Sequence, residues 1–236
     1  MQLFENLGFS ASTSQLLAIE TPLGAITSSL AVDSHLLTFE NASHFYSLET
    51  DGFAARWELS SGVAEVVISR PSLIREDWEE ITDCWAFLWR FKTLQPVKKL
   101  IVEGSWMSGY AWSDGGPDSG QNLDAQTWDD GQTTVSLGTE GDDALFVRAE
   151  ANDWLPQRFV HQSTDEYTLS LVRYLDKGLA IDFGKVFPNE LVQAHFVVAW
   201  SPYNAESMGT YNAVELYAEH ILEGADGRTE RQPKIN

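Results

Sequence analysis

The fold prediction depends most on residues 73–93, which read LIREDWEEITDCWAFLWRFKT. Apolar side chains recur in this stretch at steps of three, four and three, which is the spacing of one face of a helix with 3.6 residues per turn. These side chains are Trp78, Ile81, Trp85 and Leu88. Acidic residues gather at the start of the stretch and basic residues at its end, as the helix dipole favours. We therefore predict a Trp-rich amphipathic helix over residues 73–93, with Trp78 and Trp85 buried.

The residues before this helix have the pattern of short strands. Residues 16–70 contain brief apolar stretches separated by turn residues, and FAARWEL at residues 53–59 alternates apolar and polar positions. Alternation of this kind is typical of antiparallel strands with one buried face. We predict an antiparallel meander over residues 16–70.

The residues after the helix return to strand patterns. We expect strands at residues 99–103, 133–138, 167–175, 179–183 and 192–200. Asp176-Lys177-Gly178 predicts a tight hairpin between the third and fourth of these strands. Residues 140–151 predict an acidic helix ended by Trp154-Leu155-Pro156, and residues 211–222 fit either a helix or a strand.

These elements together predict an α+β fold, in which antiparallel β meanders pack with the Trp-rich helix and one or two further helices. We found no internal repeat and no clean linker in the 236 residues, so we expect a single domain over residues 1–236 with a loose polar tail at residues 224–236.

The segment from residue 103 to residue 153 is unusually acidic. It holds eleven acidic residues against one basic residue, a net charge of −10 in a chain whose total is −20. Within it, residues 105–131 sustain no strand or helix period, which predicts a long loop, and long loops in compact domains are often functional. We expect its aromatic and acidic side chains to form a binding site: Trp106, Tyr110, Trp112, Asp114, Asp118, Asp124, Trp128, Asp129 and Asp130. Because Trp112 and Trp128 have no apolar partner at regular spacing, we expect both to be exposed and their replacement by Ala to cost about 1 kcal/mol or less.

Charge and cysteine content exclude several classes of protein. With 15 Lys and Arg against 35 Asp and Glu, the chain has no basic stripe for phosphates and repels anionic lipid. We therefore expect no binding to nucleic acid or membranes. A single cysteine, Cys84, and the absence of a signal-peptide pattern predict a cytoplasmic protein without disulfides.

The sequence holds no specific catalytic or metal-binding motif. The five His residues have no zinc spacing, and we expect His195, in an apolar strand, to be structural. Asp114, Asp118, Asn122 and Asp124 do not follow the EF-hand pattern, which leaves only an irregular calcium site open. No nucleophile elbow or phosphate loop is present. We expect no cofactor and favour a non-catalytic protein, although carboxylates are too numerous to exclude or to nominate an acid/base pair.

The sequence supports two hypotheses for the function. The first is a non-catalytic, acidic protein-binding module, an inhibitor or immunity-type protein that masks a basic partner, in which carboxylates attract the partner and aromatic residues anchor it. The alternative is a carbohydrate-binding or carbohydrate-processing protein, because Trp and Tyr rings pack on sugars while Asp and Asn accept hydroxyl hydrogen bonds.

Overall fold

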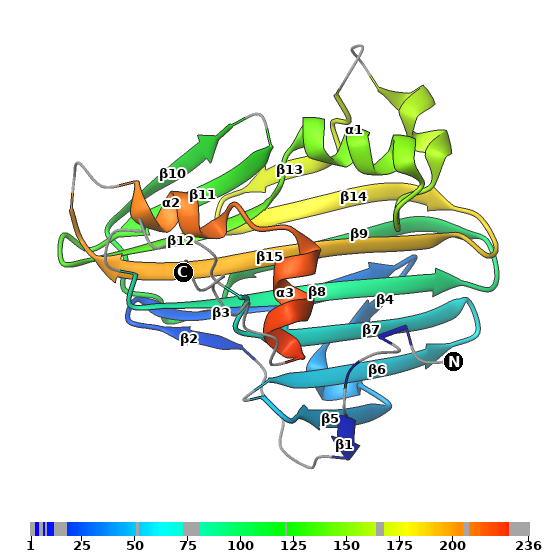
Figure 1. Cartoon of the computed structure of the whole chain (residues 1–236), viewed down its shortest axis with the longest axis horizontal. Coiled ribbons are helices and arrows are strands. Elements are labelled where there is room, and N and C mark those ends of the chain that lie inside the picture. Colours follow the sequence, from blue (N-terminus) through cyan, green and yellow to red (C-terminus); the bar gives the residue numbers. More distant parts are fainter. Residues whose placement is uncertain are drawn as a thin grey trace, which may run out of the picture.

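Two antiparallel sheets form the bulk of the molecule (Figure 1). The computed structural model describes residues 3–4, 7, 9–11, 18–50, 52–72, 81–120, 122–163, 168–204 and 208–226. The nine-stranded sheet has, in spatial order, the strands β1 (Phe9–Ala11), β5 (His44–Leu48), β6 (Phe53–Leu59), β7 (Gly62–Ser69), β8 (Asp83–Thr93), β15 (Leu191–Pro202), β12 (Thr133–Glu140), β11 (Leu123–Asp129) and β10 (Asp114–Ser119). The six-stranded sheet has the order β13 (Val172–Leu175), β14 (Gly178–Val186), β9 (Val97–Trp106), β3 (Gly24–Val32) and β2 (Ile19–Thr21), with β4 (His35–Leu37) paired to β3.

Short helices accompany the sheets. They are the 3₁₀ helices η1 (Phe39–Asn41) and η2 (Gln157–Gln162) and the α-helices α1 (Asp142–Ala151), α2 (Gly209–Val214) and α3 (Ala218–Ala225). Helix α2 contacts β12 and β15, and α3 contacts β7 and β8, so both lie on the outer face of the nine-stranded sheet (Figure 1). Within the described residues, no helix has the length and apolar character needed to span a bilayer.

The predicted α+β fold class is wrong, because the described chain is a β-sandwich with short peripheral helices. The predicted Trp-rich helix is the main error. Its C-terminal half is β8, a central strand of the nine-stranded sheet, while residues 73–80, which include Trp78, lie outside the described residues. Trp85 is only half-buried, in contrast to the prediction.

Strand β8 is apolar on both faces, which explains why its sequence resembles a helix. Its odd-numbered aromatic side chains Phe87, Trp89 and Phe91 enter the core between the sheets, whereas Ala86 and Leu88 face outward toward the helices. A strand buried on both faces has a nearly continuous apolar sequence, and such a sequence satisfies helical and strand spacing equally well.

Several other predicted elements are confirmed. The meander over residues 16–70 forms β2 to β7, although its strands divide between the two sheets. The predicted strands at residues 99–103, 133–138, 179–183 and 192–200 correspond to β9, β12, β14 and β15, and the acidic helix to α1. Leu175 pairs with Gly178, as the predicted hairpin requires, and residues 211–222 contribute to two helices, α2 and α3. Tyr167 and residues 227–236 of the predicted tail lie outside the described residues, whereas residues 224 and 225 end α3.

The predicted long loop at residues 105–131 is wrong. Strand β9 continues to Trp106, and β10 and β11 form an antiparallel pair that leaves only residues 107–113 as a connection between β9 and β10. The segment is Gly- and Asp-rich because β10 is the edge strand of the nine-stranded sheet. Edge strands commonly carry charge and Pro, which discourage pairing with another chain.

Hydrophobic side chains form two layers, one on each face of the nine-stranded sheet. The larger cluster joins residues of both sheets, for example Leu30 of β3, Val102 of β9 and Trp89 of β8. A smaller cluster lies on the outer face and includes Val197 of β15 and Ile221 of α3. The outer face is thus partly apolar beneath the helices, and its remaining part is available for polar side chains.

Candidate functional site

A row of polar side chains crosses the outer face of the nine-stranded sheet. Arg56, Glu65, Arg90 and Gln193 occupy matching register positions on the adjacent strands β6, β7, β8 and β15. Arg56 forms an ion pair with Glu65 at 2.6 Å, and Arg90 Nε donates to Gln193 Oε1 at 2.9 Å. The backbone of Leu3 completes the row, because its N–H donates to Glu65 Oε2 and its carbonyl accepts from Arg90 Nη1.

The Arg90 guanidinium lies between two aromatic rings. Its Cζ atom is 4.6 Å from the ring centroid of Phe4 and 4.1 Å from that of Trp154, both within the range of cation–π attraction. Burial lowers the pKa of Arg90 to about 10, while the nearby carboxylate of Asp153 opposes this decrease. Arg90 therefore stays cationic at neutral pH.

A buried ion pair lies beside this row. Glu140, the last residue of β12, pairs with Arg148 of α1, and their side chains are only 3% and 11% exposed. Arg148 also donates to the backbone carbonyls of Asp153, Trp154 and Gln193, each at 3.3 Å. These bonds join α1, the segment after it and β15 at one point.

His195 lies behind the ion pair. Its ring is fully buried, Nδ1 is 3.7 Å from Glu140 Oε2, and neither ring nitrogen has a hydrogen-bond partner among the described residues. Burial lowers the pKa of His195, so its imidazole is neutral at pH 7. His195 is buried in a strand, beside the Glu140 carboxylate and the backbone of Leu216.

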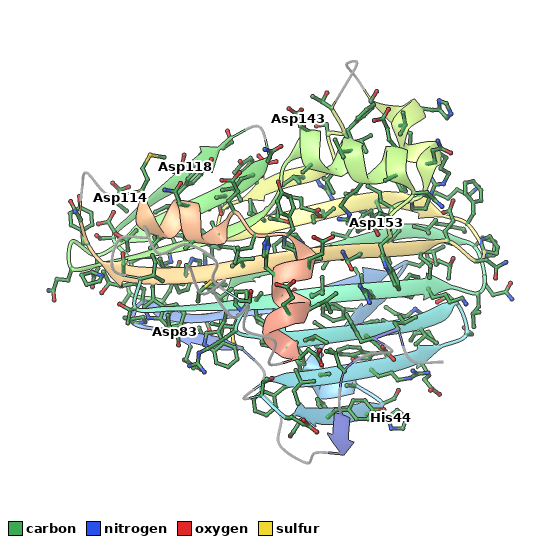
Figure 2. The ribbon with its side chains drawn as sticks, in the orientation of Figure 1. His44, Asp83, Asp114, Asp118, Asp143 and Asp153 are labelled. Carbon is green, nitrogen blue, oxygen red and sulfur yellow. The ribbon has the colours of Figure 1, made fainter. Side chains whose placement is uncertain are left out.

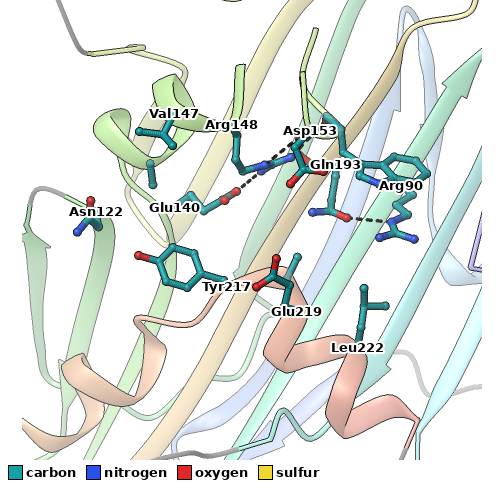
Figure 3. Close-up of a pocket in the computed structure, with 13 residues that line it drawn as sticks. Arg90, Asn122, Glu140, Val147, Arg148, Asp153, Gln193, Tyr217, Glu219 and Leu222 are labelled. Carbon is teal, nitrogen blue, oxygen red and sulfur yellow. Dashed lines mark hydrogen bonds and ion pairs between the residues drawn. The ribbon is translucent and has the colours of Figure 1, made fainter. Parts of the chain in front are cut away.

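A pocket of about 560 Å³ opens between α1, α3 and these outer-face residues (Figure 3). Figure 3 shows Arg148 and Asp153 on one side of the pocket and Tyr217 and Glu219 on the other. The lining residues are Arg90, Asn122, Glu140, Ala144, Val147, Arg148, Asp153, Trp154, Gln193, Tyr217, Ala218, Glu219 and Leu222. The volume of this pocket and its lining of apolar, polar and charged side chains are typical of a site for a small molecule.

The polar groups of the pocket differ in whether they already have partners. Arg90 and Arg148 use their guanidinium groups in the bonds described above. By contrast, the side chains of Asp153, Glu219 and Asn122 are exposed and form no hydrogen bond or ion pair with the described residues, although the Asp153 carboxylate lies near enough to Arg90 to favour its charge. The pocket therefore presents hydrogen-bond acceptors, with two positive charges against three negative ones.

The wall that carries Asp153 has a strained backbone. Asn152 ends α1 in the left-handed conformation that Asn commonly adopts there, whereas Trp154, with a φ angle of 48°, lies in the same region, which is rare for bulky side chains. The carbonyl of Trp154 accepts from the N–H of Gln193 at 2.9 Å as well as from Arg148. The surrounding structure thus holds Trp154 in an unfavourable conformation, a feature that concentrates at functional sites.

The four aromatic residues of the predicted binding site come together elsewhere in the molecule. Tyr110 and Trp112 stack with ring centroids 4.5 Å apart, and Trp106 meets Trp128 edge to face at 5.4 Å. Trp106 and Trp128 are 5% and 2% exposed, which contradicts the expectation that Trp128 lies open to solvent, and Trp112 is half-buried. The indole N–H groups of Trp106 and Trp112 are buried without a partner among the described residues. These rings pack mainly into the core between the sheets.

The five predicted carboxylates serve mostly local structure. Asp129 accepts from the N–H of Gly131, and Asp130 accepts from the N–H groups of residues 132 and 133, which lowers the pKa of Asp130. Asp124 accepts from the Tyr174 hydroxyl at 2.6 Å. Asp114 and Asp118 lie on the edge strand β10, far from Asp153 in Figure 2. No group of three or more acidic, His or Cys side chains suited to a metal ion occurs in the described part of the chain, so the calcium alternative gains no support there.

The sequence analysis placed no residue of this pocket in the predicted binding site, and it considered Asn122 only for calcium. The available signal was a polar residue within an apolar strand, such as Arg90 in β8 or Gln193 in β15. A polar side chain at such a position needs a partner, and the partners here come from distant parts of the chain.

Fold and pocket define a two-sheet antiparallel β-sandwich with a mixed-charge pocket on its outer face. No protein-family model and no curated protein matches the chain. Among solved structures, a putative kojibiose phosphorylase from human microbiome is similar over 93% of this chain and 30% of its own length, with 9% sequence identity and a TM-score of 0.46. The chain thus spans less than a third of that protein, and a likeness of this degree supports no inference about function.

Proposed function

We propose that the chain binds a neutral carbohydrate or similar polyhydroxylated ligand in the pocket between α1, α3 and the nine-stranded sheet. The observation that carries the proposal is the set of exposed pocket acceptors that form no hydrogen bond with the described residues, Asp153, Glu219 and Asn122. Carboxylates accept strong hydrogen bonds, and a ligand rich in hydroxyl donors satisfies several of them at once.

The charges of the pocket favour a neutral ligand over an anion. An anion needs free cationic donors, but Arg148 is paired with Glu140 and Arg90 is engaged by Gln193 and Leu3. The three carboxylates of the pocket would also repel it. Phosphorylated and acidic ligands are therefore disfavoured.

A cationic ligand is disfavoured by Arg90. The Trp154 ring already attracts the Arg90 guanidinium at 4.1 Å, and a second cation on the same ring would lie close to that charge. A sugar instead brings C–H groups that pack on an aromatic surface without a net charge. The half-exposed Trp154 indole thus suits a sugar ring.

The predicted basic protein partner stays a prediction. Its main support was an extended loop with free carboxylates, and Asp124, Asp129 and Asp130 are instead engaged in local hydrogen bonds. Recovery of a stoichiometric basic protein in pull-downs that weaken with salt remains the appropriate test.

The carbohydrate proposal is tested by isothermal titration calorimetry with three probe sets. These are neutral mono- and oligosaccharides, sugar phosphates, and polyamines. We expect heat of binding only from neutral saccharides, and we expect Asp153→Asn and Glu219→Gln each to weaken binding about tenfold or more, because a hydrogen bond to a charged group contributes about 1.5–3 kcal/mol. Glu150→Gln, on α1 but outside the pocket, is the matched control and should bind as wild type does.

Two results would contradict the proposal. Binding of polyamines in preference to saccharides would replace it with a cation site. Saccharide binding that both pocket variants leave unchanged would place the sugar elsewhere.

A further inference from the structure

A second cavity adjoins the pocket across Trp154. It has a volume of about 490 Å³, and Asp153 and Trp154 line both cavities. Its other lining residues are Asn152, Pro156, Gln157, Arg158, Asn189, Glu190 and Leu191. The strained segment that forms the wall of the first pocket is therefore a shared wall.

The second cavity has the same balance of charge as the first. Arg158 pairs with Glu190 through two nitrogen–oxygen contacts of 2.7 and 2.8 Å and also donates to the carbonyl of Lys185. Its guanidinium is therefore neutralised locally. The side-chain amides of Gln157 and Asn189 form no hydrogen bond with the described residues. Amides both donate and accept, so the cavity suits hydroxyl groups and offers no unpaired cation to an anion.

Because Asp153 and Trp154 line both cavities, one ligand could occupy both of them. Trp154 has a φ angle of 48°, a conformation that is unfavourable for a bulky side chain. Arg148 and Gln193 nevertheless hold the Trp154 carbonyl, and Arg90 stacks on its ring. This arrangement sets the indole between two cavities that both offer hydrogen-bonding groups and no unpaired cation.

We propose that the two cavities are adjoining subsites of one groove, and that the ligand is an oligosaccharide with at least one unit on each side of Asp153 and Trp154. The inference rests on the proposed function, because it assigns a chain length to the same carbohydrate ligand. Each cavity alone falls in the 300–1,000 Å³ range of small-molecule sites, so neither is a mere extension of the other.

The test is calorimetric titration with glucose and with α-1,4- and β-1,4-linked gluco-oligosaccharides of two to four units. In at least one linkage series, the dissociation constant should fall at least tenfold from the single unit to two or three units. The double variant Gln157→Ala/Asn189→Gly should lower the ratio of trisaccharide to monosaccharide affinity to about one. Gly at position 189 accepts the left-handed φ of 67°, so this change adds no backbone strain.

Two further variants sharpen the result. Gln162→Ala lies on the same 3₁₀ helix as Gln157 but outside the cavity, and it should keep the wild-type ratio. Trp154→Gly removes the shared ring while relieving its backbone strain, and it should weaken the binding of every chain length. A thermal melt of each variant checks that it is folded.

The outcomes separate the two proposals. If glucose binds and the affinity does not depend on chain length, or if the double variant keeps the length dependence, the groove is wrong while the carbohydrate proposal stands. If no saccharide of either series binds, the groove proposal is overturned, and binding of other neutral sugars in the wider screen then decides the carbohydrate proposal separately.

Discussion

Gly115 lies directly opposite Trp128 in the β10–β11 pair, and a side chain at this position has no room. A Cβ atom on Gly115 would be 2.0 Å from Trp128 Cδ1, whereas ordinary contacts begin at 3.4 Å, so ring and strand must separate by about 1.4 Å. Trp128 cannot retreat easily, because it is 2% exposed and packs against Trp106 and Trp112. Overpacking of a core typically costs 1–3 kcal/mol, and we expect Gly115→Ala to cost about 3 kcal/mol.

Gly116 supplies a matched control at the next position. A Cβ atom there meets nothing within 4 Å, because the pleat turns it to the opposite side of the strand from the Trp128 ring. Gly116→Ala should therefore leave stability unchanged or raise it by about 0.4–1 kcal/mol through the unfolded state. Urea unfolding followed by circular dichroism measures both free energies, and the Gly115 variant should melt roughly 6–12 °C below wild type.

A double-mutant cycle identifies the cause. In a Trp128→Ala background the clash is absent, and Gly115→Ala should then cost less than about 1 kcal/mol. Equal effects of Gly115→Ala and Gly116→Ala would refute the reasoning, because they would mean that β10 and β11 do not pair in this register. The segment would then be the long loop that the sequence predicts.

Three further predictions concern the core, the ion pair and pH. Trp128→Ala should cost about 3–5 kcal/mol and the half-buried Trp112→Ala clearly less, as measured by urea unfolding; a loss of 1 kcal/mol or less at both positions would restore the exposed-loop prediction. Arg148→Gln should destabilise by about 3–5 kcal/mol because it leaves a buried carboxylate unpaired, whereas Arg173→Gln, which breaks an exposed ion pair, should cost about 1 kcal/mol or less. Burial raises the pKa of Asp142 to about 6, so the folded state retains a proton that the unfolded state loses between about pH 4 and pH 6. Stability attributable to this group therefore falls as pH rises through that window, and Asp142→Asn should raise the melting temperature relative to wild type at pH 8 but not at pH 3.5.

The strands that the sequence predicts correctly are those whose signal is local. The hairpin between β13 and β14 has a turn sequence that specifies its own geometry, and Leu175 pairs with Gly178 as expected. Strand β6 alternates because one of its faces meets the core and the other carries Arg56. Turn chemistry and period-two alternation act within a few residues, so one sequence suffices to read them.

The helix prediction for the residues of β8 is wrong for a reason that is not local. Whether Trp85 and Leu88 share a face depends on whether the chain is helical, and the strand places them on opposite faces of the sheet. What decides the matter is the pairing of β8 with β7 and β15, whose partner residues lie far away in the sequence, such as Phe196 opposite Phe87. Tertiary pairing overrides local periodicity when both faces of a strand are buried.

The pocket could not be predicted from the sequence, again because its residues are far apart in the chain. Its charged residues come from β8, β12, α1, the segment after α1 and α3, and each appears on its own as an ordinary surface charge. The aromatic cluster is an intermediate case. Composition indicates that Trp106, Tyr110, Trp112 and Trp128 belong together, but only the packed structure shows that they join the core between the sheets.

Some acidic residues of this chain stabilise a strand edge or a turn, and others have no such structural role. On β10, Asp114 and Asp118 flank Pro117, which has no N–H to offer, and this combination discourages edge-to-edge pairing of an exposed strand. Asp129 and Asp130 cap the turn that follows β11. Asp153 stands apart, since its exposed side chain forms no hydrogen bond with the described residues and its backbone adjoins the strained Trp154 beside a pocket. Charge that stabilises an edge or a turn requires no ligand, so the case for binding rests on the few carboxylates, Asp153 foremost, that line a pocket and form no hydrogen bond within the described chain.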